Sequence, residues 1–246
     1  MCLDHEADRE VDSELVQNLL SEYSGHLLDL KSLSDYDRAS MTYFTDQKAT
    51  LQPRLNISIP LEVTGIHHAF TEMTKINGTF TGYLTWGLLA AMRQHPYLSW
   101  RFMNGMWYAF DDLPLFIPVA TGLPGNRFVS VTLKHIAAAD WVSFSQIYTT
   151  AIEKARQNWS NPFGDQFHWS NYHFIGNLPD IQFTSLMLHE SGIETARPIF
   201  YFGQRYQNQG SLFIPFTIQF HHATFDPVRL SQFIADFNRI LTHESD

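Results

Sequence analysis

The sequence predicts one α/β domain, a two-layer sandwich in which helices cover a mixed β-sheet. Three observations support this fold class. The 246 residues fit one large domain or two small ones, and 44% hydrophobic and 15% aromatic residues are enough for a substantial core. Strand-like segments outnumber helix-like segments, and the helices are scattered among them. No internal repeat, linker or low-complexity stretch divides the chain.

The N-terminal third begins with a predicted helix. Residues 11–23 carry apolar side chains at helical spacing, and Asp12 and Ser13 lie near a plausible helix cap. We expect this helix to pack on the domain or on a neighbouring subunit. Residues 24–35 are predicted to be a connector, and residues 36–44 a short amphipathic helix or turn.

A strand, a helix and a hairpin follow. Alternating apolar residues predict a strand over residues 55–66, with Pro60 at an edge or bulge. Residues 80–94 form a long apolar helix that ends before a proline. Residues 100–110 are predicted to be a hairpin with Asn104-Gly105 at its turn, a strong local signal.

The next hundred residues alternate between strands, one helix and loops. Strands are predicted at residues 116–121, 128–134, 181–188 and 198–206. A helix is predicted at residues 144–159, with its inward face formed by Ile147, Ala151, Ile152 and Ala155. Loops or turns are predicted at residues 162–173 and 207–210.

The stretch from Gln219 to Asp226 has the clearest chemical content. It follows an apolar strand at residues 211–220 and precedes a helix that starts at Pro227. His221 and His222 are adjacent, and Asp226 comes four residues after the second histidine. An imidazole titrates near neutral pH, so a positioned ring can take a proton from a hydroxyl. Asp226 would orient the ring or hold the turn.

A structural role is the alternative for these histidines, because most histidines are neither catalytic nor metal ligands. The chain contains a second doublet, His67-His68, that lacks a similarly placed aspartate. We expect that doublet at a strand edge, with one ring inward and one outward. A histidine doublet alone is therefore weak evidence, and its surroundings decide its role.

Composition limits the function further. The net charge is −9 with no run of Lys or Arg, so nucleic acid and anionic membrane surfaces are not expected partners. The single cysteine, Cys2, rules out an internal disulfide and points to a reducing compartment, most simply the cytoplasm. The charged residues 4–10 do not resemble a signal peptide, and no apolar run approaches the ~20 residues of a membrane span.

The sequence resembles the chloramphenicol acetyltransferase family, whose hallmark is His-His-x-x-x-Asp-Gly before the C-terminal helix. His221 to Asp226 match this motif, and Pro227 replaces the glycine. The resemblance covers about residues 36–241, which separates an N-terminal helical extension (1–35) from a single acyltransferase-like domain (36–246). Further colinear matches are Tyr36–Arg38, Phe80–Pro96 with the Asn104-Gly105 hairpin, Ile181–Ser185 and Pro198–Gly203.

The resemblance implies roles for four residues. His222 would be the general base that deprotonates an acceptor hydroxyl, and Ser185 would donate a hydrogen bond to the oxyanion. Asp226 would be structural, paired with Arg38. Alternatively, Ser185 is an ordinary strand serine and Arg38 a surface charge.

The resemblance also implies a donor and an assembly. Acetyl-CoA would supply the acyl group, no metal would be needed, and chloramphenicol is the first acceptor to test. Relatives with two lobes use about twice this length, so a single-lobed chain is expected to share its site with a neighbour. The family does this as a homotrimer, a closed ring with interfacial sites.

Two departures from the family affect the expected site, one in the turn after Asp226 and one in the acceptor pocket. Pro227 lacks an N–H and fixes its φ angle, so the turn after Asp226 is expected to differ. Tyr201 stands where the family usually has a threonine, so Tyr201 and His221 are candidates for a reshaped acceptor pocket. A repurposed relative that binds an aromatic small molecule, or that catalyses another biosynthetic step, is therefore the alternative function.

A metal-dependent alternative would use His168, His173 and His189 with His221. Their spacing matches no compact ligand motif, which weighs against it. The sequence also lacks G-x-S-x-G, P-loop and dinucleotide-binding motifs.

Overall fold

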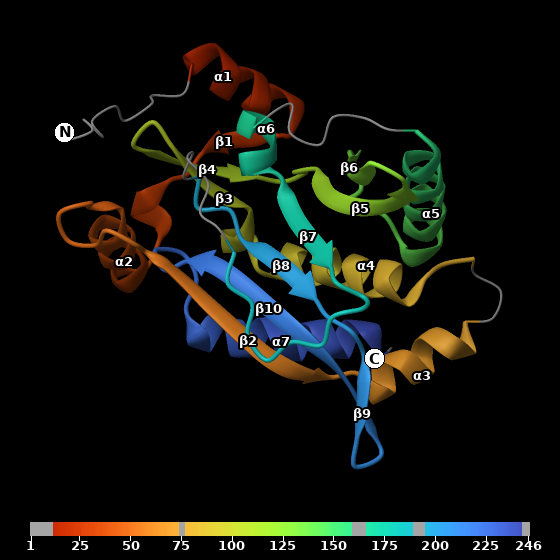
Figure 1. Ribbon diagram of the computed structural model, residues 1–246. Helices are drawn as coiled ribbons and strands as arrows, with labels where there is room; N and C mark the ends of the chain where they lie inside the picture. Colours follow the sequence, from red (N-terminus) through yellow and green to blue (C-terminus); the bar gives the residue numbers. More distant parts are fainter. Residues whose placement is uncertain (1–11, 74–76, 159–165, 189–194, 243–246) are drawn as a thin grey trace, which may run out of the picture.

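The computed structural model describes residues 12–73, 77–158, 166–188 and 195–242. Within these ranges the chain forms one seven-stranded and one three-stranded sheet, with helices packed around them (Figure 1). Parallel and antiparallel pairs both occur in the larger sheet, which confirms the predicted α/β class with a mixed sheet.

The large sheet has the strand order β2-β10-β8-β7-β5-β6, and β9 pairs with the start of β10. Strand β7 runs parallel to both of its neighbours, and the other pairs are antiparallel. The strands are β2 (Arg54–Glu62), β5 (Leu115–Leu123), β6 (Asn126–Leu133), β7 (His173–Asn177), β8 (Ile199–Phe202), β9 (Tyr206–Asn208) and β10 (Ser211–His221). Because β2 lies at one edge, its Pro60 fits the prediction of an edge position.

Helices α4 (Phe80–Gln94) and α7 (Pro227–Leu241) lie together behind the sheet (Figure 1). Helix α5 (Trp141–Gln157) covers β5 and β6, and α3 (Thr64–Glu72) packs on α7. The main core fills the space between this helix layer and the sheet. On β10 the residues that face this core are Ile214, Phe216, Ile218 and Phe220. The alternate residues on the other face are Thr217, Gln219 and His221, which are also buried.

The predicted hairpin forms the second sheet with an unexpected third strand. Strands β3 (Trp100–Met103) and β4 (Met106–Phe110) meet at Asn104-Gly105, where both φ angles are positive at 49° and 73°. Such a turn matches the twist of the strands. Strand β1 (Gly25–Leu27) pairs with β4, so residues 25–27 of the predicted connector belong to the sheet.

The N-terminal helix α1 (Ser13–Glu22) packs on this part of the domain. Its cap is Asp12, as predicted, and its apolar face shares a cluster with Tyr108, Phe110 and Tyr172. The short helix η1 (Leu30–Ser32) then leads to α2 (Asp35–Thr45). The division of the chain at residue 36 stays a prediction.

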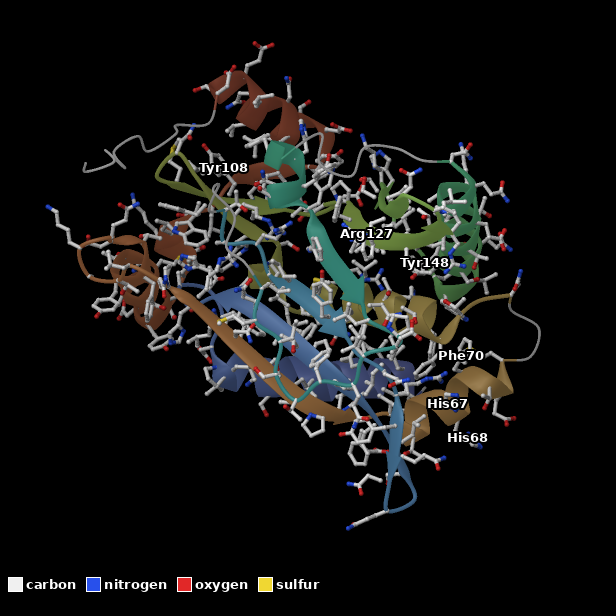
Figure 2. All side chains as sticks on the ribbon, viewed as in Figure 1. His67, His68, Phe70, Tyr108, Arg127 and Tyr148 are labelled. Carbon is white, nitrogen blue, oxygen red and sulfur yellow. The ribbon has the colours of Figure 1, made fainter. Side chains whose placement is uncertain are left out.

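The strand predicted over residues 55–66 ends at Glu62, and α3 starts at Thr64. His67 and His68 therefore lie on a helix, so the expected strand edge was wrong (Figure 2). His67 contacts the ring of Phe80 at 5.1 Å between centroids, and His68 is exposed. The reason is that the alternating pattern gives way after Val63 to a helical one.

Two other segments differ from prediction. The predicted loop 162–173 contains α6 (Gln166–Asn171) and the start of β7, whereas residues 162–165 lie outside the described ranges. Strand β7 escaped prediction because it is short and begins with a polar residue, the buried His173, which pairs with β5.

Residues 181–188 were predicted to be a strand, but they form an irregular segment with a bend at Thr184 and without ladder pairing. Leu186 is held instead by side chains of β2: Asn56 Nδ2 donates to its carbonyl at 2.7 Å, and its N–H donates to Ser58 Oγ at 3.3 Å. The segment therefore lies against β2 without joining the sheet.

Two predicted element boundaries also moved. The predicted strand 198–206 is divided between β8 and β9. In α5, Ile147 is 43% exposed and does not face inward as expected, and the predicted helix end at Trp159 lies outside the described ranges. The short helix η2 (Pro96–Ser99) fills the interval between α4 and β3.

Candidate active site

His222 lies at the point where β10 ends and the chain turns toward α7. Its peptide N–H donates to the carbonyl of Pro53 at 2.7 Å, and its own carbonyl accepts from Ser40 Oγ at 3.2 Å. The imidazole is half-buried and lies against the ring of Phe44, with 4.4 Å between ring centroids. The backbone of His222 is thus held by Pro53, just before β2, and by Ser40 of α2. One face of its ring is covered by Phe44 of α2.

The tautomer of His222 follows from its hydrogen bond. Nδ1 lies 3.2 Å from the carbonyl oxygen of Phe225, three residues further along. A carbonyl oxygen only accepts, so Nδ1 must carry the proton in this contact. In the neutral ring this leaves the lone pair on Nε2. The local fold therefore presents a proton acceptor at Nε2, which is what a general base requires.

His221 has the opposite arrangement. It is only 2% exposed, and its Nδ1 accepts from the N–H of Ala223 at 3.1 Å, which places the proton of the neutral ring on Nε2. The ring meets Trp107 edge-on at 6.0 Å. The structure thus places this candidate pocket residue in the interior.

Asp226 is the N-cap of α7. Its Oδ1 accepts from the N–H groups of Val228 at 2.8 Å and Arg229 at 3.0 Å. Pro227 takes the first helical position, where an N–H would have no intrahelical partner in any case. The expected structural role of Asp226 therefore has a geometric basis, and Pro227 fits the turn.

The expected pairing of Asp226 with Arg38 was wrong. Arg38 donates to the carbonyl of Leu33 and to the carboxylate of Asp35, both close to it in the chain. Within the described ranges, the ion pair that joins α2 to α7 is Asp37 with Arg229, at 2.5 Å. Sequence reasoning missed both residues. Only their positions could have indicated this pair, because Asp37 directly precedes Arg38 and Arg229 lies in the first helical turn after Asp226.

Ser185 is exposed on the irregular segment 181–188, which lies against β2. No hydrogen bond or ring contact among the described residues joins it to His222. The structure therefore does not bring the two proposed catalytic side chains together within one chain.

Tyr201 lies on β8, directly opposite Gly176 of β7. A Cβ atom at Gly176 would overlap the tyrosine ring, so the ring lies flat over the glycine. Phe174 adds a ring contact with 5.7 Å between centroids. Burial raises the pKa of the Tyr201 hydroxyl, and the nearby charge of Arg197 lowers it to a smaller extent.

We expect Gly176→Ala to destabilise the fold by about 1–3 kcal/mol, the usual cost of overpacking a close contact. The physical reason is the overlap with Tyr201, so the double variant with Tyr201→Thr should lose less stability than the two single losses added together. Urea unfolding of the three variants checks this, and strict additivity would contradict it.

Comparison of the whole sequence with models of known families shows which family the chain belongs to. A family model described as chloramphenicol acetyltransferase matches residues 28–238. The chain belongs to the chloramphenicol acetyltransferase family.

Individual relatives are more distant. A chloramphenicol acetyltransferase of Campylobacter coli is 27% identical over 109 residues, which are 41% of this chain and 52% of that protein. The match thus spans about half the length of that curated relative. A solved chloramphenicol acetyltransferase has a TM-score of 0.74 at 17% identity and covers 88% of this chain and 99% of its own. The cubic core of the pyruvate dehydrogenase multienzyme complex has a TM-score of 0.59 at 12% identity, covering 87% and 91%. These likenesses concern the fold.

In this member of the chloramphenicol acetyltransferase family there is a hollow of about 220 Å³, and its lining does not include His222, Ser185 or Tyr201. His173 lines it and is 5% exposed; burial and the charge of Arg101 lower its pKa to about 3. Arg101 is fully buried and donates to the carbonyls of Asn171, Leu98 and Trp100 at 2.7–3.0 Å. Neither residue was assigned a role in the fold from the sequence.

The metal alternative finds no support in the described part of this family member. No three His, Cys, Asp or Glu side chains gather there as ligands, and His189 lies outside the described ranges. Over the same ranges, no helix is both long enough and apolar enough to cross a membrane.

Proposed function

We propose that the protein transfers an acyl group, acetyl in the first instance, from CoA to a hydroxyl of a small molecule such as chloramphenicol. The observation that carries this proposal is the Nδ1–H of His222 bonded to the Phe225 carbonyl, which leaves Nε2 as a proton acceptor. Membership of the chloramphenicol acetyltransferase family supports the same reaction class.

The proposed reaction has two steps. Nε2 of His222 takes the proton of the acceptor hydroxyl while the hydroxyl oxygen bonds to the thioester carbonyl carbon, giving a tetrahedral oxyanion. The hydroxyl group of Ser185 donates a hydrogen bond to that oxyanion and keeps its proton. The carbon–sulfur bond then breaks, the thiolate takes the proton from the imidazolium, and the ester and free CoA leave.

We propose that each site is shared by two copies of the chain in a homotrimer. Support comes from the lack of contact between Ser185 and His222 within one chain, and from the exposure of Ser185. A closed ring repeats one heterologous interface and so makes equivalent shared sites.

Complementation tests the shared site. Chains carrying His222→Ala and chains carrying Ser185→Ala are mixed as unfolded protein and refolded together. If neighbours share a site, about a quarter of the sites in a random equal mixture regain both groups, and activity returns. If each site belongs to one chain, the mixture stays as inactive as its parts. Light scattering reports the mass of the assembly in both cases.

Release of free thiol from acetyl-CoA tests the reaction, with a panel of alcohols and amines that starts with chloramphenicol. Acceptor-dependent thiol release with a matching acetylated product is expected. Tight binding of an aromatic ligand without thioester consumption would instead favour the repurposed relative. The half-buried Tyr201 ring is the observation that favours this second candidate, because it fills space over Gly176 of β7.

We expect Ser185→Ala to lower kcat by about 10²–10³-fold, because it removes a donor aimed at charge that exists only in the transition state. Thr184→Ala is the matched control, since Thr184 is the adjacent exposed residue of the same irregular segment. Steady-state kinetics check both variants. Equal losses in the two would contradict the role given to Ser185.

A further inference from the structure

Arg229 connects three parts of the structure around the turn that carries His222. Its Nη2 donates to Asp37 Oδ1 on α2 at 2.5 Å, and its Nη1 donates to the carbonyl of Thr224 at 2.5 Å. Its guanidinium lies 4.3 Å from the ring centroid of Tyr97. The side chains of Arg229 and Asp37 are 21% and 13% exposed, so this ion pair is largely shielded from water.

The contact at Thr224 reaches the imidazole through one peptide unit. The next carbonyl along the chain, that of Phe225, accepts the Nδ1–H of His222. The Phe225 side chain is 1% exposed and packed against Tyr97 and Phe220. Arg229 holds the peptide on one side of Phe225 while the core holds its side chain, so the direction of the accepting carbonyl is fixed.

The contact at Asp37 reaches the same imidazole through α2. Asp37, Ser40 and Phe44 are spaced three and four residues apart, so they share one face of that helix. Ser40 donates to the carbonyl of His222, and Phe44 lies against its ring. The Asp37–Arg229 ion pair therefore holds one face of α2 against the turn. The same face contacts the backbone and the ring of His222.

From this geometry we propose that Arg229, with Asp37, is a positioning residue that sets the tautomer and orientation of the His222 imidazole. The inference rests on the proposed function for its catalytic consequence. The charges of this ion pair are placed in the opposite way to those of the Arg38–Asp226 pair expected from the sequence. Here the carboxylate lies on α2 and the guanidinium on α7. Arg38 and Asp226 each form their hydrogen bonds with residues nearby in the sequence.

The test compares Arg229→Gln with Arg38→Gln, a matched arginine variant that discriminates between the two placements of the charges. We expect Arg229→Gln to lower kcat about 10- to 100-fold with little change in KM, because it misplaces a reacting group without touching substrate. Arg38→Gln should retain wild-type kcat. Arg229→Lys should recover part of the loss, because it keeps a charge toward Asp37 but lacks the planar fork that spans two acceptors.

A second measurement does not depend on turnover. Nitrogen NMR shifts of the neutral His222 ring report which nitrogen carries the proton, and the Nδ1–H form is expected to dominate in the wild type. Arg229→Gln and Asp37→Asn should both shift the ring toward the Nε2–H form, and Arg38→Gln should not. Asp37→Asn serves where Arg229→Gln fails to fold.

The outcomes separate the two proposals. A wild-type tautomer and kcat in folded Arg229→Gln or Asp37→Asn would overturn the positioning role, as would a loss confined to Arg38→Gln. A tautomer shift in a protein that releases no thiol with any acceptor would uphold the positioning role while the proposed function fails.

Discussion

We expect His222→Ala to lower kcat for acetyl transfer by about 10²–10⁴-fold, the usual contribution of a positioned general base. The variant removes the Nε2 lone pair that the Phe225 contact leaves available. The KM values for acceptor and acetyl-CoA should change much less, because the proposed role is in the transition state. Steady-state assays of thiol release, with product identified by mass, provide the measurement.

His68→Ala is the control for this variant, because His68 belongs to the second histidine doublet and is exposed on α3 (Figure 2). It should retain wild-type kcat. Circular dichroism should show both variants folded, since His222 is only half-buried at a turn. Undiminished turnover by His222→Ala would remove the proposed mechanism.

The sequence predicted the strand–turn–helix unit around His222 because each part carries a local signal. The strand has a long apolar run, and α7 has an apolar stripe that starts next to a capping aspartate and a proline at the first helical position. The Asn104-Gly105 turn was predictable for the same reason, since two consecutive positive φ angles favour these residue types. Local rules fixed these elements, and the tertiary fold did not override them.

The ion pair beside the site was not predictable in this way. Asp37 and Arg38 are neighbours on a helix, about 100° apart around its axis, so the face that meets α7 decides which one pairs. That choice depends on how Ser40 and Phe44 pack against the turn. It is a tertiary property, and sequence order does not encode it.

The differences between the two histidines also arise where a local rule ends. Strand alternation puts His221 on the buried polar face of the sheet with Thr217 and Gln219. His222 follows the last strand residue, so the turn sets its direction through the Phe225 carbonyl. Because that acceptor is a backbone atom, no side chain in the sequence marks it. The proton acceptor at Nε2 becomes evident only from the geometry of the turn.

The buried His173 is expected to make the free energy of unfolding depend strongly on pH in acid. Burial, followed by the charge of Arg101, lowers its pKa to about 3, whereas an unfolded histidine titrates near its ordinary value of about 6.5. Between these values the unfolded chain binds a proton that the folded chain does not. The free energy of unfolding therefore falls as the pH drops through this window, by up to about 1.4 kcal/mol per pH unit.

Replacing His173 by glutamine removes this proton uptake, so the stability of His173→Gln should depend less steeply on pH than that of the wild type. Between pH 7 and pH 5 the wild type should lose about 2 kcal/mol more than the variant. Urea unfolding at several pH values measures the difference, because titrations common to both proteins cancel. His68→Gln controls for an exposed histidine and should follow the wild-type curve. Parallel curves for the wild type and His173→Gln would show that the imidazole is protonated inside the fold, next to Arg101, against the burial that the structure gives it.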